Sequence, residues 1–328
     1  MKRGFLNSSK AKARPLGPDP VPAAASEPAP SGSWHFPIGK QEKVDISFPE
    51  GFTDELKNMK LQECDPLGGS TPGTMTYTTV PFGGPYSDTE QASECFFYPG
   101  SKEVLMRIPG FPHALTQPPG PTFRMTDMQG KGAGLVAAHA LKMGDLILSE
   151  RPLFVSARGV PVPTPSTFSR AQVMQLTLQG HEKYSAVSID RMRPEAKKAF
   201  MALRNCHTED GSGPIVGIVR TNGMALEGLR PGVKDETREY SAVCKDISRL
   251  NHSCSPNTAP RFYMPSFSYR LYAVRDIAAG EELTYQYITV DVPAAQRQVA
   301  LKPYDFVCAC PACTEDVPAS DKRRKAIS

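Results

Sequence analysis

The chain has 328 residues, of which 40% are hydrophobic, and a formal net charge of +4 at pH 7. This length allows one large domain or two small ones, with enough apolar material for a core. The charge is too small to indicate nucleic-acid binding by itself. No apolar run reaches the about 18 residues that span a bilayer, and the start does not resemble a secretory signal. The eight cysteines therefore indicate metal ligands and buried thiols in a reducing compartment, the cytoplasm or the nucleus.

The first 118 residues divide into two segments of different composition. Residues 1–40 are rich in Pro, Ala and Ser and have little to bury, so we expect them to be disordered. Residues 41–118 are interrupted by Gly and Pro at short intervals. We expect an ordered but irregular extension there, with a short helix near Thr53 and a strand at 74–80.

Residues 119–290 have the pattern of a domain built mainly from short strands. Extended segments are expected at 122–127, 135–138, 145–148, 267–273 and 282–287. In 267–273 the alternation predicts that Phe267, Tyr269, Leu271 and Ala273 face the core.

A helical insertion at about 166–204 interrupts these strands. One helix is expected to begin near Ser169 and to stop at Gly180, and a second to open with Pro194 in its first turn. Beyond Gly211 we expect the chain to return to strands.

Three cysteines near the C-terminus, Cys308, Cys310 and Cys313, are one ligand short of a zinc site. Structural zinc takes four ligands in a tetrahedron, so the fourth must come from elsewhere in the fold. The best candidate is Cys254, in the segment Arg249-Leu-Asn-His-Ser-Cys-Ser-Pro-Asn257. We therefore expect a zinc-binding segment at 291–315. The basic tail that follows, 316–328, is either a capped helix start or a localisation patch.

Other polar motifs are ambiguous when each is taken alone. The glycine turn Gly130–Gly134 lies between strands and fits neither a dinucleotide fingerprint nor a phosphate loop. Asn251-His252 is either a structural pair or a recognition pair for an amino acid or adenine, fixed in place by the neighbouring zinc ligand. Tyr285 and Tyr287 are either packing residues or groups that orient an amine.

The roles of these polar motifs become clearer when four motifs are taken together in their order along the chain. They are Gly132-Ala-Gly-Leu135, Arg249-Leu-Asn-His-Ser-Cys254-x-Pro-Asn257, Gly280-Glu-Glu-Leu-Thr-x-x-Tyr287 and Cys308-x-Cys-x-x-Cys313. Over about residues 121–315 this set resembles the SET-domain family of protein lysine methyltransferases. The insertion and the Asn-His-Ser-Cys sequence resemble the SET-and-MYND group. No Cys/His cluster of the MYND zinc module occurs within the insertion, as in MYND-lacking fungal SET proteins.

The resemblance implies an α+β fold that is mainly β, with a helical insertion. It is a β-clip of small sheets in which the Asn-His segment threads beneath a neighbouring loop as a pseudoknot, an exception to the usual rule. A post-SET segment that binds structural zinc follows, with Cys254 as one of the four ligands.

The resemblance also implies methyl transfer from S-adenosylmethionine to a protein lysine. The implied cofactor contacts are Lys131, Gly132, Gly134, Asn222, Asn251, His252, Tyr287 and Phe306. Tyr287 matches the catalytic tyrosine, while Tyr285 and Tyr304 are expected to wall the lysine channel. The zinc takes no part in the chemistry.

Two rival interpretations belong to other classes: a SET-like interaction module without activity, and an interaction module stabilised by zinc alone. Since Asn251, His252 and Tyr287 are all present, we favour activity.

Histone tails, translation-related proteins and other lysine-bearing proteins remain open as substrates. No nucleic acid or membrane is required, and a monomer is expected.

The remaining cysteines, Cys64, Cys95, Cys206 and Cys244, are expected to be buried thiols. A second metal site at Cys206-His207 is the less favoured alternative.

Overall fold

The computed structural model describes residues 33–35, 39–49, 62–63, 75–83, 91–162 and 164–326. Its helices are α1 (Ser101–Met106), α2 (Arg170–Arg191), α3 (Pro194–Met201), α4 (Pro214–Asn222), α5 (Ala294–Leu301), α6 (Pro311–Thr314) and α7 (Val317–Lys325). Short 3₁₀ helices lie at Glu236–Arg238, Ile247–Arg249, Met264–Ser266 and Lys302–Tyr304. Within the described ranges, no helix is both long and apolar enough to cross a membrane. The helix expected near Thr53 lies outside the described residues.

The largest sheet has six strands in the order β10-β11-β8-β4-β3-β2. These strands are β2 (Gln62–Glu63), β3 (Thr76–Val80), β4 (Ser93–Phe97), β8 (Phe154–Ala157), β10 (Met224–Leu226) and β11 (Tyr240–Val243). The predicted strand at 74–80 is confirmed as β3. Since β4 pairs in parallel with β8, the extension before residue 118 supplies strands to the sheet of the domain. The described part of that extension is therefore less irregular than expected.

A two-stranded sheet joins β1 (Ser33–His35) to β9 (Gly159–Pro161) in antiparallel register. The expectation of disorder for residues 1–40 does not hold for these three residues.

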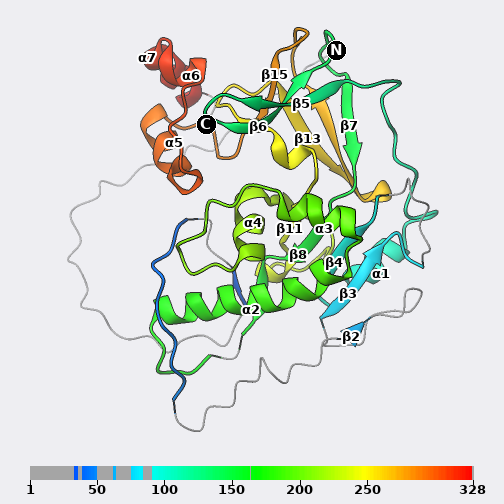
Figure 1. Cartoon of the computed structure of the whole chain (residues 1–328), viewed down its shortest axis with the longest axis vertical. Helices are drawn as coiled ribbons and strands as arrows, with labels where there is room; N and C mark the ends of the chain where they lie inside the picture. Colours follow the sequence, from blue (N-terminus) through cyan, green and yellow to red (C-terminus); the bar gives the residue numbers. More distant parts are fainter. Residues whose placement is uncertain are drawn as a thin grey trace, which may run out of the picture. The chain divides into compact units, whose positions relative to one another are not determined.

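Helices α2, α3 and α4 lie together beside β4, β8 and β11 (Figure 1). Helix α2 begins after Ser169, where the sequence predicted a helix start. The Ser169 hydroxyl caps the helix together with Gln172. The predicted stop at Gly180 is wrong, because α2 continues for eleven more residues to Arg191. A glycine inside a helix costs only about 1 kcal/mol. Burial of the flanking Leu178 and Tyr184 outweighs that cost.

The expectation of strands after Gly211 is wrong at α4. This helix begins with Pro214 at its first turn, as Pro194 does in α3. The helix is buried on nearly all sides, with Ile215, Val216, Ile218 and Val219 among its buried residues. Packing of these residues against α2 favours the helix over the expected strand.

Two smaller sheets carry most of the motifs. The first, in the order β12-β15-β6-β5, consists of β5 (Phe123–Met128), β6 (Gly132–Ala137), β12 (Asn251–His252) and β15 (Glu282–Tyr285). The second, in the order β13-β14-β7, consists of β7 (Leu146–Glu150), β13 (Thr258–Tyr263) and β14 (Ser268–Ala273). The expected extended segments are therefore present. All four residues predicted to face the core from 267–273 are buried, although Ser268 is buried as well.

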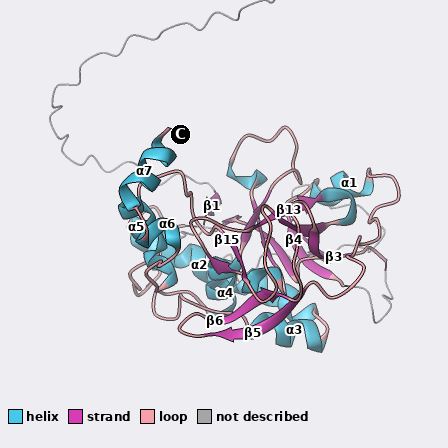
Figure 2. Cartoon of the chain, turned by 90° about the horizontal axis from the view of Figure 1, so that it is seen from above, coloured by secondary structure: helices cyan, strands magenta, loops and turns pink. Residues whose placement is uncertain are grey.

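The pairing of β12 brings distant motifs together. Asn251 lies opposite Thr284 and His252 opposite Tyr285 in a parallel ladder. On its other edge β15 pairs antiparallel with β6, which follows the glycine turn. Three of the four motifs therefore meet in one small sheet, and helices α5, α6 and α7 gather at the chain end in both views (Figures 1 and 2).

Candidate active site and metal centre

One cavity of about 820 Å³ collects nearly all the candidate residues. Those that line it are Lys131, Gly132, Asn222, Asn251, His252, Tyr285, Tyr287, Tyr304 and Phe306. The volume falls within the range of about 300–1,000 Å³ that is typical of small-molecule sites. Gly134 does not line the cavity, but it lies directly behind Asn251.

The glycine turn allows a close approach of β6 to the Asn-His segment. A Cβ atom at Gly134 would lie 2.5 Å from Met128 Cγ and 2.8 Å from Asn251 Nδ2. Gly130 and Gly132 both have φ of 75°, a conformation that other residues rarely adopt. The glycines are therefore required by the backbone shape and by the space that Asn251 occupies.

Asn251 is held by a carboxylate to which the sequence analysis gave no role. Its Nδ2 donates to Glu282 Oε1 at 2.9 Å, and Glu282 Oε2 pairs with Lys131 Nζ at 2.7 Å. Glu282 thus links the glycine turn to the Asn-His segment. The hydrogen bond to Glu282 uses one of the two N–H donors of the amide, so Asn251 keeps a second N–H and its carbonyl oxygen, a hydrogen-bond acceptor. The position of Glu282 directly before the Leu-Thr-x-x-Tyr sequence was the one available signal.

Asn222, at the end of α4, presents the same acceptor group. Both N–H donors of its amide are used, at 2.7 Å to the carbonyl of Arg204 and at 2.7 Å to that of Ile218. Its free group is therefore also a carbonyl oxygen, suited to an ammonium or amine.

The imidazole of His252 binds within the protein through both nitrogens. The backbone N–H of Tyr287 donates to Nδ1 at 3.0 Å, so Nε2 carries the ring proton and donates to Cys254 Sγ at 3.2 Å. Burial lowers the pKa of His252 to about 4, which keeps the ring neutral. Contact with a ligand must therefore use the ring face or the backbone of His252.

Tyr287 lies within a cluster of aromatic rings. Its ring centroid is 5.2 Å from that of Tyr285, 5.0 Å from that of Tyr304 and 6.4 Å from that of Phe306. Its hydroxyl donates to the Leu250 carbonyl at 2.6 Å, which leaves the oxygen lone pairs free to accept. Burial raises the pKa of Tyr287 well above its usual value, so the phenol stays neutral.

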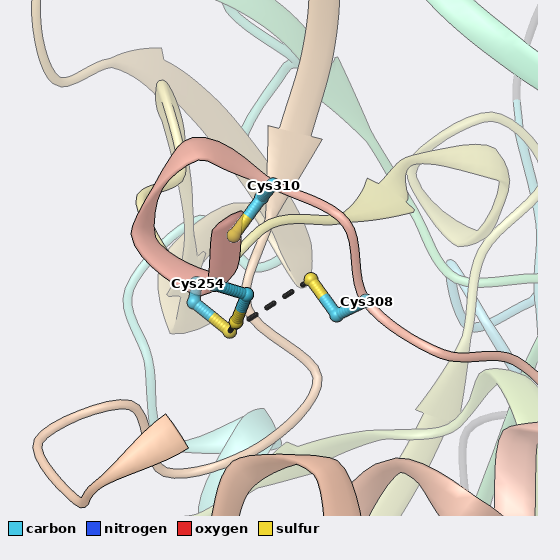
Figure 3. Close-up of side chains that lie close together, drawn as sticks. Cys254, Cys308 and Cys310 are labelled. Atoms are coloured by element: carbon cyan, nitrogen blue, oxygen red, sulfur yellow. Dashed lines mark hydrogen bonds between the residues drawn. The ribbon is translucent and has the colours of Figure 1, made fainter. Parts of the chain in front are cut away.

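The four predicted zinc ligands come together at the rim of the cavity. The sulfur atoms of Cys254, Cys308, Cys310 and Cys313 all lie within 4.8 Å of one another. Figure 3 shows three of these side chains pointing toward one another from two separate segments. Cys254 Sγ is 3.9 Å from Cys308 Sγ and 3.5 Å from Cys313 Sγ. A zinc tetrahedron with bonds of about 2.3 Å has sulfur–sulfur edges of about 3.8 Å, so the cluster fits the ion.

Two arginines support this cluster. Arg297 of α5 is fully buried and donates to the Ala312 carbonyl at 2.9 Å and to Cys313 Sγ at 3.5 Å. Arg324 of α7 donates to the Cys254 carbonyl at 2.8 Å and also to the Val290 carbonyl. Positive charge beside thiolates favours their ionised, metal-binding form. Part of the basic tail is therefore a structural support of the cysteine cluster.

The other cysteines belong to no such cluster within the described ranges. Cys95, Cys206 and Cys244 are free and buried, as expected, and Cys64 lies outside the described residues. His207 pairs with Asp210 at 2.7 Å and joins no metal-binding group.

Comparison with known families agrees with this geometry. Residues 132–288 match the family described as SET domain. Residues 132–288, a little under half of the chain, therefore have the sequence of a SET domain, and the small sheets, helices and C-terminal cysteine cluster agree with what the resemblance implied.

Its relatives include fungal and animal methyltransferases. Histone-lysine N-methyltransferase set5 of Schizosaccharomyces pombe is 28% identical over 211 residues, 63% of this chain and 56% of that protein. Histone-lysine N-methyltransferase SMYD3 of Homo sapiens is 44% identical over 75 residues, 22% of this chain and 17% of that protein. N-lysine methyltransferase SMYD2-B of Danio rerio is 40% identical over 74 residues, 22% of this chain and 17% of that protein. The chain thus spans little more than half the length of set5 and less of the others.

Proposed function

We propose that this protein transfers a methyl group from S-adenosylmethionine to the side-chain amine of a lysine in a protein substrate. The names of the relatives support the reaction class, since they are lysine methyltransferases. Histones are the substrate class that two of those names suggest, and a nuclear or cytoplasmic location goes with it.

The observation that carries the proposal is the state of Tyr287. Its phenol is half-buried in the aromatic cluster, is neutral, and has its proton engaged with the Leu250 carbonyl. It therefore cannot act as a base at neutral pH. It can accept a hydrogen bond from an amine N–H and so hold the nitrogen lone pair in one direction.

The residues present fit the cofactor. Asn222 and Asn251 offer carbonyl oxygens to an ammonium group, the glycine turn brings backbone close to the cavity, and Phe306 lies on the wall. When bound, S-adenosylmethionine supplies the methyl group on a positively charged sulfur. The target amine, with a pKa near 10.4 in water, must first release its proton to solvent. The apolar rings around Tyr287 favour that neutral form.

Zinc, held by Cys254, Cys308, Cys310 and Cys313, has a structural role in this proposal. A four-cysteine site is closed, with no position for a substrate. The loop that carries Tyr304 and Phe306 directly precedes three of the ligands, so the ion would fix one wall of the cavity.

The test is Tyr287→Phe, assayed with radiolabelled cofactor on a cell extract that the wild type methylates. Loss of a positioned catalytic hydrogen bond predicts a decrease in turnover of about 100-fold or more. Binding of S-adenosylhomocysteine, measured by calorimetry, should change little, because the phenol acts mainly in the transition state.

Tyr263→Phe is the matched control, since Tyr263 is an exposed tyrosine on β13. It should methylate the extract at the wild-type rate. Equal rates for Tyr287→Phe and wild type would remove Tyr287 from the mechanism. If the wild type binds cofactor but labels no protein in any extract, the interaction-module interpretation is the better one.

A further inference from the structure

A charged side chain with a buried, unsatisfied nitrogen lines the cavity. Arg249 ends the 3₁₀ helix Ile247–Arg249 and contributes to the cavity wall. Its Nε is buried and, within the described part of the chain, meets no hydrogen-bond acceptor. Leaving such a group unsatisfied costs about 1–3 kcal/mol, and more when it is charged. Native proteins usually satisfy such groups with a ligand, an ion or water.

The acidic residues of the cavity do not fill this role, because each is already paired. Those that line it are Glu281, Glu282 and Asp305. Their cationic partners, in the same order, are Arg275 at 2.6 Å, Lys131 at 2.7 Å and Lys40 at 2.5 Å. Among the described lining residues, no unpaired carboxylate is left for Arg249, so its guanidinium is available to an anionic group of a ligand.

The neighbour of Arg249 indicates which ligand group that is. Leu250 has an extended backbone and a fully buried side chain, while Arg249 and Asn251 on either side of it both line the cavity. Two residues of extended chain span about 7 Å. Arg249 and Asn251 therefore bring a guanidinium and an amide to the same wall of the cavity. A ligand that carries a carboxylate and an ammonium group on the same carbon would satisfy both the guanidinium of Arg249 and the amide oxygen of Asn251.

We propose that Arg249 binds the carboxylate at the amino-acid end of the cofactor, while Asn251 accepts a hydrogen bond from the adjacent ammonium group. The inference rests on the proposed function, which supplies this ligand. Guanidinium binds a carboxylate through two parallel N–H groups, which gives direction as well as charge. Arg249 is therefore a residue that selects ligands with an intact amino-acid end.

The test compares two ligands that differ only in that carboxylate. They are S-adenosylhomocysteine and its decarboxylated analogue, which keeps the ammonium group, and both are titrated by calorimetry. The wild type should bind the first about 10- to 100-fold more tightly, the range expected for hydrogen bonds to a charged group. Arg249→Met should bind the two ligands equally, with the affinity for the analogue unchanged. Arg249→Lys should keep part of the preference, since it retains the charge without the planar fork.

Arg275→Met is the matched control, because it removes a cation that lines the same cavity but is paired with Glu281. It should keep the wild-type preference. Melting temperatures of all variants separate a local effect from unfolding.

Three results would overturn the inference. The first is an Arg249→Met protein that keeps the preference, and the second is one that loses both ligands equally. The third is unchanged ligand binding with a raised KM for the protein substrate, which would assign Arg249 to an acidic residue of that substrate. A wild-type protein that binds neither ligand would instead reject the proposed function itself.

Discussion

Replacing the buried acid Glu150 should change how stability depends on pH. Glu150 ends β7, is only 1% exposed, and accepts hydrogen bonds from the backbone N–H groups of Ile247 at 2.6 Å and Asp246 at 3.1 Å. It thereby holds the turn that leads to Asn251. Burial, reinforced by the charge of Asp246, raises the pKa of Glu150 to about 7, although the two N–H groups oppose the shift.

The sign of the effect follows from proton uptake. An unfolded glutamate releases its proton near pH 4.5, whereas the folded protein holds it up to about pH 7. Between these values the folded state binds the extra proton, so stability contributed by this group falls as the pH rises. The gap from 4.5 to about 7 corresponds to at most about 3–4 kcal/mol, at about 1.4 kcal/mol per pH unit.

Glu150→Gln removes this titration and keeps an amide oxygen for the Ile247 N–H. Urea unfolding of both proteins from pH 5 to pH 8 gives the difference in unfolding free energy at each pH. We expect that difference to shift in favour of the variant as the pH rises, by up to about 3 kcal/mol. A difference that is flat with pH, or that shifts the other way, would show that the backbone donors outweigh burial. Glu281→Gln is the opposite control, because a hydrogen bond from Arg275 lowers the pKa of Glu281.

Three further predictions concern the site. Cys254→Ser should reduce the zinc content, measured by elemental analysis, well below one ion per chain; unchanged content would reject Cys254 as a ligand. Asn251→Ala should weaken S-adenosylhomocysteine binding by about 1–3 kcal/mol, the cost of an unpaired buried polar group, and wild-type affinity in calorimetry would contradict this. Gly134→Ala should weaken the same binding without unfolding the protein, since its methyl group would displace Asn251 Nδ2 from 2.8 Å; an unchanged affinity would show that Asn251 adapts.

The positions of several strands along the sequence could be predicted, because one face of each strand is buried or because Gly and Pro mark its ends. Alternation identified β14, and Gly and Pro delimited β3, β6 and β7, because these signals depend only on neighbouring residues. Helix α4 and the length of α2 were not predictable in this way. Both depend on packing against the six-stranded sheet, which a run of β-branched residues or a single Gly180 does not reveal.

Parts of the candidate site could be predicted and parts could not. The missing fourth ligand pointed to Cys254, because zinc chemistry fixes the number of ligands. In contrast, the nitrogens of His252 are used within the protein, and the guanidinium of Arg249 is left over after all the acids of the cavity are paired. The hydrogen-bond partners of these side chains depend on which groups meet in the folded structure, so they could not be predicted from a local sequence pattern.

The short strand β12 explains why the metal centre and the cavity lie side by side. Two paired residues give few ladder hydrogen bonds, so β12 needs support at both ends. Glu150 holds the turn before it, and Cys254 would hold the end through zinc. Between these supports Asn251 faces the cavity, while His252 connects Cys254 to the backbone of Tyr287. One extended segment therefore presents polar groups to the cavity and, through its buried residues, joins the cysteine cluster to Tyr287.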